Sequence, residues 1–166
     1  MKLGALAVAA TLAWLAPATA QDRQNYFDDP FVQVTSAVPA CPIPEGPLRT
    51  PEEVRAVAHV RTQHGVSCHR SGRCRLPNSY LYDKEIIPRV AIYLQQDGRF
   101  NDTSVWVLGE RRLVTLMGCV QSQEQALAME RAVLLVDDVM GVVNYLMVGT
   151  IGTPAYRIAA PAAPAK

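Results

Sequence analysis

The sequence contains few histidines and none of the short motifs that mark common catalytic sites. His59, His64 and His69 are its only histidines, and they lie within one short segment. A Ser-His-Asp triad cannot be assigned from such a cluster. There is no glycine-rich phosphate loop and no Cys-x-x-Cys-His motif for haem attachment. We therefore predict that the protein is not an enzyme, and we expect no cofactor.

The chain also lacks a strong excess of charge of either sign. Its 16 lysines and arginines stand against 15 aspartates and glutamates, for a formal net charge of +1 at pH 7. This balance gives no support to a nucleic acid or a strongly acidic partner, and we expect no nucleic-acid partner.

The local charge distribution is different from the overall one. From Val54 to Arg75 there are five arginines and no acidic residue. Arginine grips phosphate oxygens in a fork, so these side chains are candidates for binding an anionic ligand. A solvated surface is the simpler explanation of the same residues. The five candidates are Arg55, Arg61, Arg70, Arg73 and Arg75.

No segment after residue 20 has the length and freedom from charge of a membrane span. Residues 1–20 resemble a secretory signal peptide, with Lys2 before an apolar run that ends at Leu15 and the small residues "ATA" before Gln21. A buried N-terminal helix is the alternative. We expect cleavage near Ala20 and a mature protein in the periplasm that has no transmembrane segment.

Four cysteines remain after that cleavage, namely Cys41, Cys68, Cys74 and Cys119. In an oxidising compartment they are expected to form two disulfides, for which three pairings exist. The cluster of cysteine and histidine at 64–74 has no usual zinc spacing, so we predict no metal site. A redox-active pair typically has the spacing Cys-x-x-Cys, whereas five residues separate Cys68 from Cys74. A structural bridge between them is the simpler interpretation.

Residues 21–79 are predicted to form an extension with a single short helix. Residues 21–48 show no clear period and are read as extended or irregular. Thr50 is a candidate N-cap for a helix at about 51–64, which Gly65 can end. A loop that contains Cys68 and Cys74 follows.

The remainder reads as helix, strand, strand, helix, strand. A helix begins near Asp83, two strands within 103–120 are joined near Gly109 and Glu110, and Ser122 caps a second helix that ends near Val136. The last strand covers 142–148, and the tail 150–166 lacks the material for a core, which predicts disorder. The fold class is therefore α+β, a two-layer domain with a three-stranded mixed sheet and two helices, preceded by the cysteine-containing extension.

Three stretches resemble the BON domain, a small module of bacterial envelope proteins. They are "YDKEIIPRVAIYLQQDGRF", "RRLVTLMGCVQS" and "VDDVMGVVNYLMV", and the resemblance covers about residues 80–149. Asp138 stands where the family usually has glycine, but aspartate tolerates the left-handed conformation better than most residues, so we expect the turn to survive. The resemblance carries over no catalytic or ligand-binding residue.

The resemblance implies a non-enzymatic binding or interaction module that supports envelope integrity or stress tolerance. Its partner would be anionic phospholipid or another envelope component, such as a protein. The alternative hypothesis is a periplasmic thiol-redox or metal-binding protein that uses the Cys/His segment 64–74.

The strand 113–120 is apolar on both of its faces, which a half-exposed strand normally is not. Its second face and the matching faces of the other strands form a candidate interface of Trp106, Leu113, Met117, Tyr145 and Met147. We expect the segment 21–80 to cover this face, with Cys119 bound to Cys41 and Cys68 left to pair with Cys74. A partner protein or a second copy of the chain is the alternative cover.

Overall fold

The structure is a computed structural model of the chain and describes residues 23–160. The signal peptide predicted at 1–20 and the end of the tail, 161–166, lie outside the described residues. Within 23–160, no helix combines the length and the apolar character that a membrane crossing would need.

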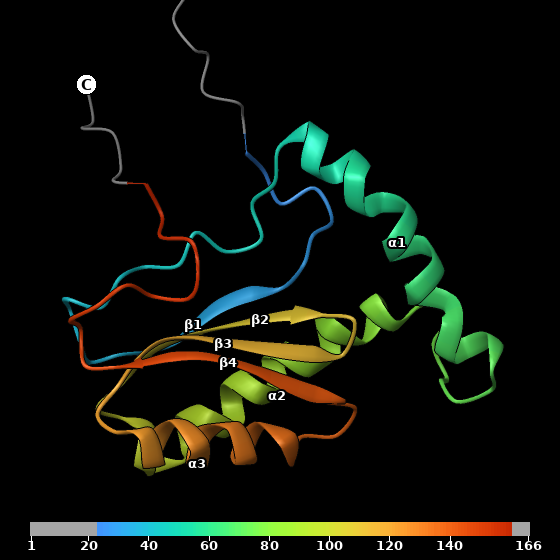
Figure 1. The fold of residues 1–166 in the computed structure, drawn as a ribbon. Helices are drawn as coiled ribbons and strands as arrows, with labels where there is room; N and C mark the ends of the chain where they lie inside the picture. The colour runs from blue at the N-terminus through green and yellow to red at the C-terminus, as the bar shows by residue number, and fades with distance from the viewer. Residues whose placement is uncertain (1–22, 161–166) are drawn as a thin grey trace, which may run out of the picture.

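Four strands form one mixed sheet in the order β1-β2-β3-β4 (Figure 1). They are β1 (Phe31–Ser36), β2 (Ser104–Glu110), β3 (Leu113–Val120) and β4 (Gly141–Val148). The pairs β1-β2 and β2-β3 are antiparallel, and β3-β4 is parallel. The helices α2 (Asp83–Gln96) and α3 (Gln123–Leu134) cover one face of the sheet, as Figure 1 shows. Short 3-10 helices at Ser79–Tyr82 and Gly98–Phe100 complete this part of the chain.

The prediction of a three-stranded sheet is wrong, because β1 from the N-terminal extension adds a fourth strand. Phe31 pairs with Leu108 and Gln33 with Trp106, and the register shifts after Gln33. This strand is short and partly exposed, and it follows Pro30 directly. Its partner strand β2 lies more than 60 residues further along the chain. No local sequence pattern could therefore predict the pairing.

The helix α1 (Pro51–Arg70) is longer than the helix predicted at 51–64. Thr50 Oγ1 accepts from the Glu53 N–H at 3.2 Å, and Glu53 Oε2 accepts from the Thr50 N–H at 2.9 Å, which completes a capping box. Gly65 does not end the helix. A Cβ at this position would lie 2.6 Å from the Asn78 side chain, so the glycine permits close packing instead.

The main core lies between the two helices and the inner face of the sheet. Ile86, Val90 and Leu94 of α2 are fully buried, with no exposed surface. Their spacing is the apolar stripe of an amphipathic helix, and each buried side chain contributes about 1.5–3 kcal/mol. The other wholly buried apolar side chains of this core include Phe100, Val105, Val107, Val114, Leu116, Met129 and Val133.

The β2-β3 hairpin turns at Arg111 and Arg112, directly after the predicted junction near Gly109 and Glu110. Both arginines have positive φ, 59° and 66°, although such turns favour Asn-Gly. The Asp83 carboxylate accepts the Arg111 N–H at 2.6 Å and the Arg112 N–H at 2.7 Å. Asp83 is the first residue of α2 and caps this turn, while the helix itself has no side-chain cap.

Two further backbone positions agree with the expected domain. Gly118 has φ 127°, and a Cβ there would lie 2.1 Å from the Ser104 carbonyl oxygen, so only glycine fits. Asp138 has φ 72°, which confirms that aspartate adopts the left-handed turn. Its carboxylate pairs with Arg89 at 3.2 Å and with Arg112 at 3.5 Å.

The outer face of the sheet is covered in part by the chain itself. A disulfide joins Cys41 to Cys119, the connectivity that the strand faces favour, and the second disulfide joins Cys68 to Cys74. Trp106 packs with the first disulfide, together with Phe31, Val38 and Met147. The segment before α1 crosses this side of the sheet, opposite the helices (Figure 1).

The tail also lies on this side over its described part. The sequence predicts disorder from residue 150, whereas residues 156–159 of the tail run beside 42–45. Glu45 N–H donates to the Arg157 carbonyl at 2.8 Å, Ala159 N–H donates to the Ile43 carbonyl at 2.8 Å, and the Tyr156 hydroxyl donates to the Pro42 carbonyl at 2.8 Å. The cover of the outer face therefore comes from both ends of the described chain.

The buried position of Asp83 predicts that stability depends on pH. Burial raises the pKa of Asp83 to about 6 from an ordinary value of 3.8, although the two turn N–H groups oppose the shift. The stabilisation is therefore fully present below the unfolded pKa and is lost as the pH rises through about 6. We expect wild type to lose about 2 kcal/mol relative to Asp83→Asn between about pH 4 and pH 7, measured by urea unfolding.

The fixed cost of placing asparagine in the turn cancels in this comparison, because only the change with pH is used. A stability difference that stays constant across this range would contradict a raised pKa for Asp83.

The two disulfides are predicted to differ in their contribution to stability. Cys41 and Cys119 are separated by 78 residues, whereas Cys68 and Cys74 are separated by 6. From loop-closure entropy we expect Cys41→Ala/Cys119→Ala to lose about 4 kcal/mol and Cys68→Ala/Cys74→Ala about 2 kcal/mol. Urea unfolding of the two variants checks the order. Equal losses, or a larger loss from the shorter loop, would be the contrary result.

Candidate functional site

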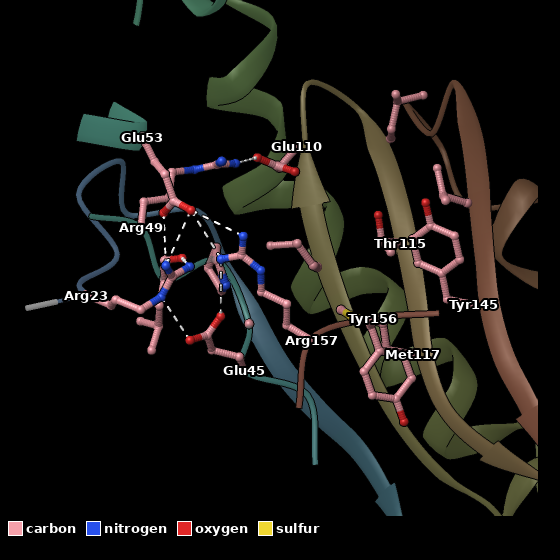
Figure 2. A pocket seen from close by; sticks show the side chains of 16 residues that line it. Arg23, Glu45, Arg49, Glu53, Glu110, Thr115, Met117, Tyr145, Tyr156 and Arg157 are labelled. Carbon is pink, nitrogen blue, oxygen red and sulfur yellow. Dashed lines mark hydrogen bonds and ion pairs between the residues drawn. The ribbon is translucent and has the colours of Figure 1, made fainter. Parts of the chain in front are cut away.

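A cavity of about 430 Å³ lies between the outer face of the sheet and the segments that cover it (Figure 2). Its floor is mostly apolar and comes from three neighbouring strands, with Leu108 on β2, Leu113 and Met117 on β3, and Val143 and Tyr145 on β4. The register places Met117 opposite Tyr145 and Thr115 opposite Val143. The floor therefore belongs to the second apolar face of the sheet, and a space remains between it and the covering segments.

Six charged side chains form a wall along one side of the cavity, as Figure 2 shows. They are Arg23, Glu45, Arg49, Glu53, Glu110 and Arg157. Arg23 Nε lies 2.9 Å from Glu45 Oε1, and Arg49 Nη2 lies 2.9 Å from Glu110 Oε1. Arg157 Nη1 lies 3.2 Å from Glu53 Oε1. The N–H of Thr50, with help from Arg157 and Arg23, lowers the pKa of Glu53 to about 2.

The charges of this wall compensate one another. The three arginines and three glutamates balance each other, and each of the six forms at least one ion pair. The 16 residues that line the cavity include no histidine, cysteine or serine. Arg23 Nε and Arg49 Nε are buried without a hydrogen-bond partner among the described residues, although Arg23 Nε lies within ion-pair distance of Glu45.

Two of the five candidate arginines have structural roles. Arg61 forms a double contact with Asp29, at 2.6 Å and 3.0 Å, and a third with Glu110 at 3.2 Å. Its guanidinium also stacks 4.0 Å from the Phe27 ring centre and 3.8 Å from that of Tyr80. Arg61 therefore fastens the start of the described chain to α1 and is not available to a ligand.

Arg75 is also paired, since its Nη2 lies 2.5 Å from Glu85 Oε2. Its guanidinium lies 5.2 Å from the centre of the Tyr82 ring. This pair is half exposed and of small energetic weight, but it satisfies the charge of Arg75.

The other three candidates, Arg55, Arg70 and Arg73, are exposed. Within residues 23–160 none of them has a carboxylate partner, and Arg73 Nε donates only to Ser71 Oγ at 3.0 Å. Arg55, His59 and Arg70 share one side of α1 by helical spacing. The structure thus divides the five arginines into two that hold the fold and three that face solvent.

The Cys/His segment does not form a metal site among the residues that the structure describes. Cys68 and Cys74 are joined to each other, and no free cysteine is present in the same part of the chain. His69 Nδ1 lies 3.1 Å from the Cys74 carbonyl oxygen, and His64 Nδ1 contacts Arg111 Nη1. The two cysteines, His64 and His69 thus make local structural contacts.

The candidate interface residues have different surroundings. Trp106 and Met117 are only 7% and 5% exposed, because the chain covers its own sheet there. Leu113 and Met147 are half-buried, and Tyr145 is 41% exposed at the edge strand β4. What remains open of the second face is the cavity floor and this edge.

Sequence reasoning missed the charged wall of the cavity. Glu45, Arg49, Tyr156 and Arg157 lie in segments predicted as irregular or disordered, and they meet only in the folded chain. No short motif joins residue 45 with residue 157, so no local signal could have found them.

Comparison with known families agrees with this geometry. Residues 82–150 match the sequence profile of the BON domain, which confirms the resemblance of residues 80–149. No curated protein and no solved structure gave a significant match. The matched region contains α2, the β2-β3 hairpin, α3 and β4, and it leaves out β1 and α1. The chain therefore carries a BON domain, formed by residues 82–150.

Proposed function

We propose that the protein is a non-enzymatic periplasmic module that binds anionic phospholipid and so supports the integrity of the envelope. The BON domain at residues 82–150 indicates an envelope-associated binding module. The two disulfides are typical of a protein that works outside the cytoplasm. The choice of phospholipid as the ligand rests on the arginines that face solvent.

The observation that carries the proposal is the exposed basic side of α1. The helix extends away from the sheet and the helix layer (Figure 1), and only Gly65 and Cys68 of its residues are buried. Arg55 and Arg70 lie on its outward side and have no carboxylate partner in the described chain. A protruding basic helix brings its charges to a flat anionic surface before the rest of the molecule meets it.

The magnitude of this attraction is modest and depends on salt. Each arginine near an anionic membrane surface contributes about 1 kcal/mol, and the effect decays over about 10 Å at moderate ionic strength. Glu52 lies one turn before Arg55 and opposes the attraction there. We therefore expect the C-terminal half of α1, with Arg70, to lie nearest the membrane.

Exchange of two outward arginines tests the proposal. We expect Arg55→Gln/Arg70→Gln to bind vesicles with phosphatidylglycerol about 30-fold more weakly than wild type in about 50 mM salt, because two contributions of about 1 kcal/mol are lost. Co-sedimentation with the vesicles measures the affinity. Vesicles of phosphatidylcholine alone should not bind wild type.

The control is Arg99→Gln/Arg131→Gln, which changes the net charge equally at exposed side chains outside α1, of which Arg99 pairs with Asp97. Its vesicle affinity should stay close to that of wild type. An equal loss in both double variants would show a nonspecific charge effect, and no loss in the first would remove α1 as the membrane contact.

A further inference from the structure

A second, smaller hollow lies where α1 meets the turn of the β2-β3 hairpin. Its volume is about 210 Å³. Arg73 and Arg111 approach it from two different loops, and His64 and Ser67 line it from α1. Leu113 and Met140 form an apolar side. Only Arg111, Leu113 and Met140 of these residues belong to the matched BON region, so the hollow depends on the extension.

The charge in this hollow is uncompensated. Among the described residues that line it there are two guanidinium groups and an imidazole but no carboxylate. The nearest acids along the chain have other partners, since Glu110 pairs with Arg49 and Arg61. The carboxylate of Asp83 accepts the two backbone N–H groups of the turn.

The backbone holds both arginines in fixed positions. Arg73 lies inside the loop closed by the Cys68–Cys74 disulfide, and its N–H donates to the Cys68 carbonyl at 2.9 Å. Arg111 stands in the left-handed turn that Asp83 holds. A site whose donors are already positioned loses less conformational entropy when it binds a ligand.

The turn itself gives a second and independent observation. The left-handed region is unfavourable for an arginine, and most hairpin turns of this kind use Asn or Gly instead. Structural contacts account for arginine at position 112. Its Nε donates to the Asp138 carbonyl at 2.8 Å, and its guanidinium lies 4.6 Å from the centre of the Tyr82 ring. The side chain of Arg111 contacts only His64 within the described chain. Folding therefore explains Arg112 but not Arg111.

We propose that this hollow binds the phosphate of a phosphate ester whose apolar part lies against Leu113 and Met140. The two guanidinium groups would donate N–H bonds to the phosphate oxygens, an arrangement that arginine supports better than lysine. Met140 is 60% exposed and leaves the apolar side open to a bound ester. A phospholipid headgroup and a soluble phosphate ester share this chemistry.

The inference deepens the proposed function, and it rests on that function only for the lipid as the source of the phosphate. The broad basic side of α1 would attract any anionic surface, whereas the hollow would select the phosphate group. The two sites use different residues, Arg55 and Arg70 for the surface and Arg73 and Arg111 for the hollow, so each can be tested without the other.

The test is a calorimetric titration of the mature chain with dihexanoyl phosphatidylglycerol below its micelle concentration. Dihexanoylglycerol, which has the same chains and no phosphate, is the matched ligand control and should not bind. We expect Arg111→Gln and Arg73→Gln each to weaken the binding of the phospholipid by at least about tenfold. Arg131→Gln, at an exposed arginine of α3 that belongs to neither proposed site, should leave it unchanged.

Urea unfolding of each variant shows whether it is folded. If Arg111→Gln is unstable, Arg73→Gln decides alone, since its side chain is exposed and contacts only Ser71. Unchanged phospholipid binding in the folded variants would overturn the site. Equal binding of dihexanoylglycerol would do the same. Inorganic phosphate that binds as tightly as the ester would overturn the role of Leu113 and Met140.

The outcome for the hollow is separate from the outcome for the proposed function. Suppose that Arg55→Gln/Arg70→Gln leaves vesicle binding unchanged, while Arg111→Gln weakens the binding of dihexanoyl phosphatidylglycerol. This result would exclude the α1 surface and support the hollow. The reverse combination would keep the surface and remove the hollow.

Discussion

The contact on which the rest of the structure depends is the one between the Asp83 carboxylate and the two N–H groups of the hairpin turn. It joins the first residue of α2 to the end of the β2-β3 ladder, and it stabilises a turn whose residues, Arg111 and Arg112, are poorly suited to it. The turn fixes the register of β2 and β3, which form the centre of the sheet. It also points Arg112 toward Asp138 and Arg111 toward α1.

A sheet with two apolar faces requires two covers. The BON domain supplies one, because α2 and α3 bury the inner face. The other comes from outside the matched region, where the Cys41–Cys119 disulfide ties the segment before α1 to the sheet over Trp106. This cover is incomplete, and the space between it and the sheet is the cavity with the charged wall. The extension thus covers part of the outer face of the sheet and forms the cavity over the rest.

Arginines in the same stretch of sequence have unlike roles because their surroundings differ. Arg61 is 12% exposed and is held by Asp29, Glu110 and two aromatic rings, so its charge stabilises the fold. Arg55 and Arg70 face solvent and keep their charge for a partner. A carboxylate within about 3 Å compensates the charge of an arginine and accepts up to two of its N–H bonds, so the position of acids decides which basic residues remain available for binding.

The sequence by itself determined the features that neighbouring residues encode: the Thr50 and Ser122 caps, the apolar stripe of α2 from Ile86 to Leu94, the left-handed Asp138 and the BON region. Tertiary structure alone decided the fourth strand, the clamp around Arg61 and the wall that joins Glu45 to Arg157. Caps and periodic stripes act over one or two helical turns, so they are visible in a short window. The other contacts join residues tens of positions apart, and their partners are chosen by packing and charge in the folded chain.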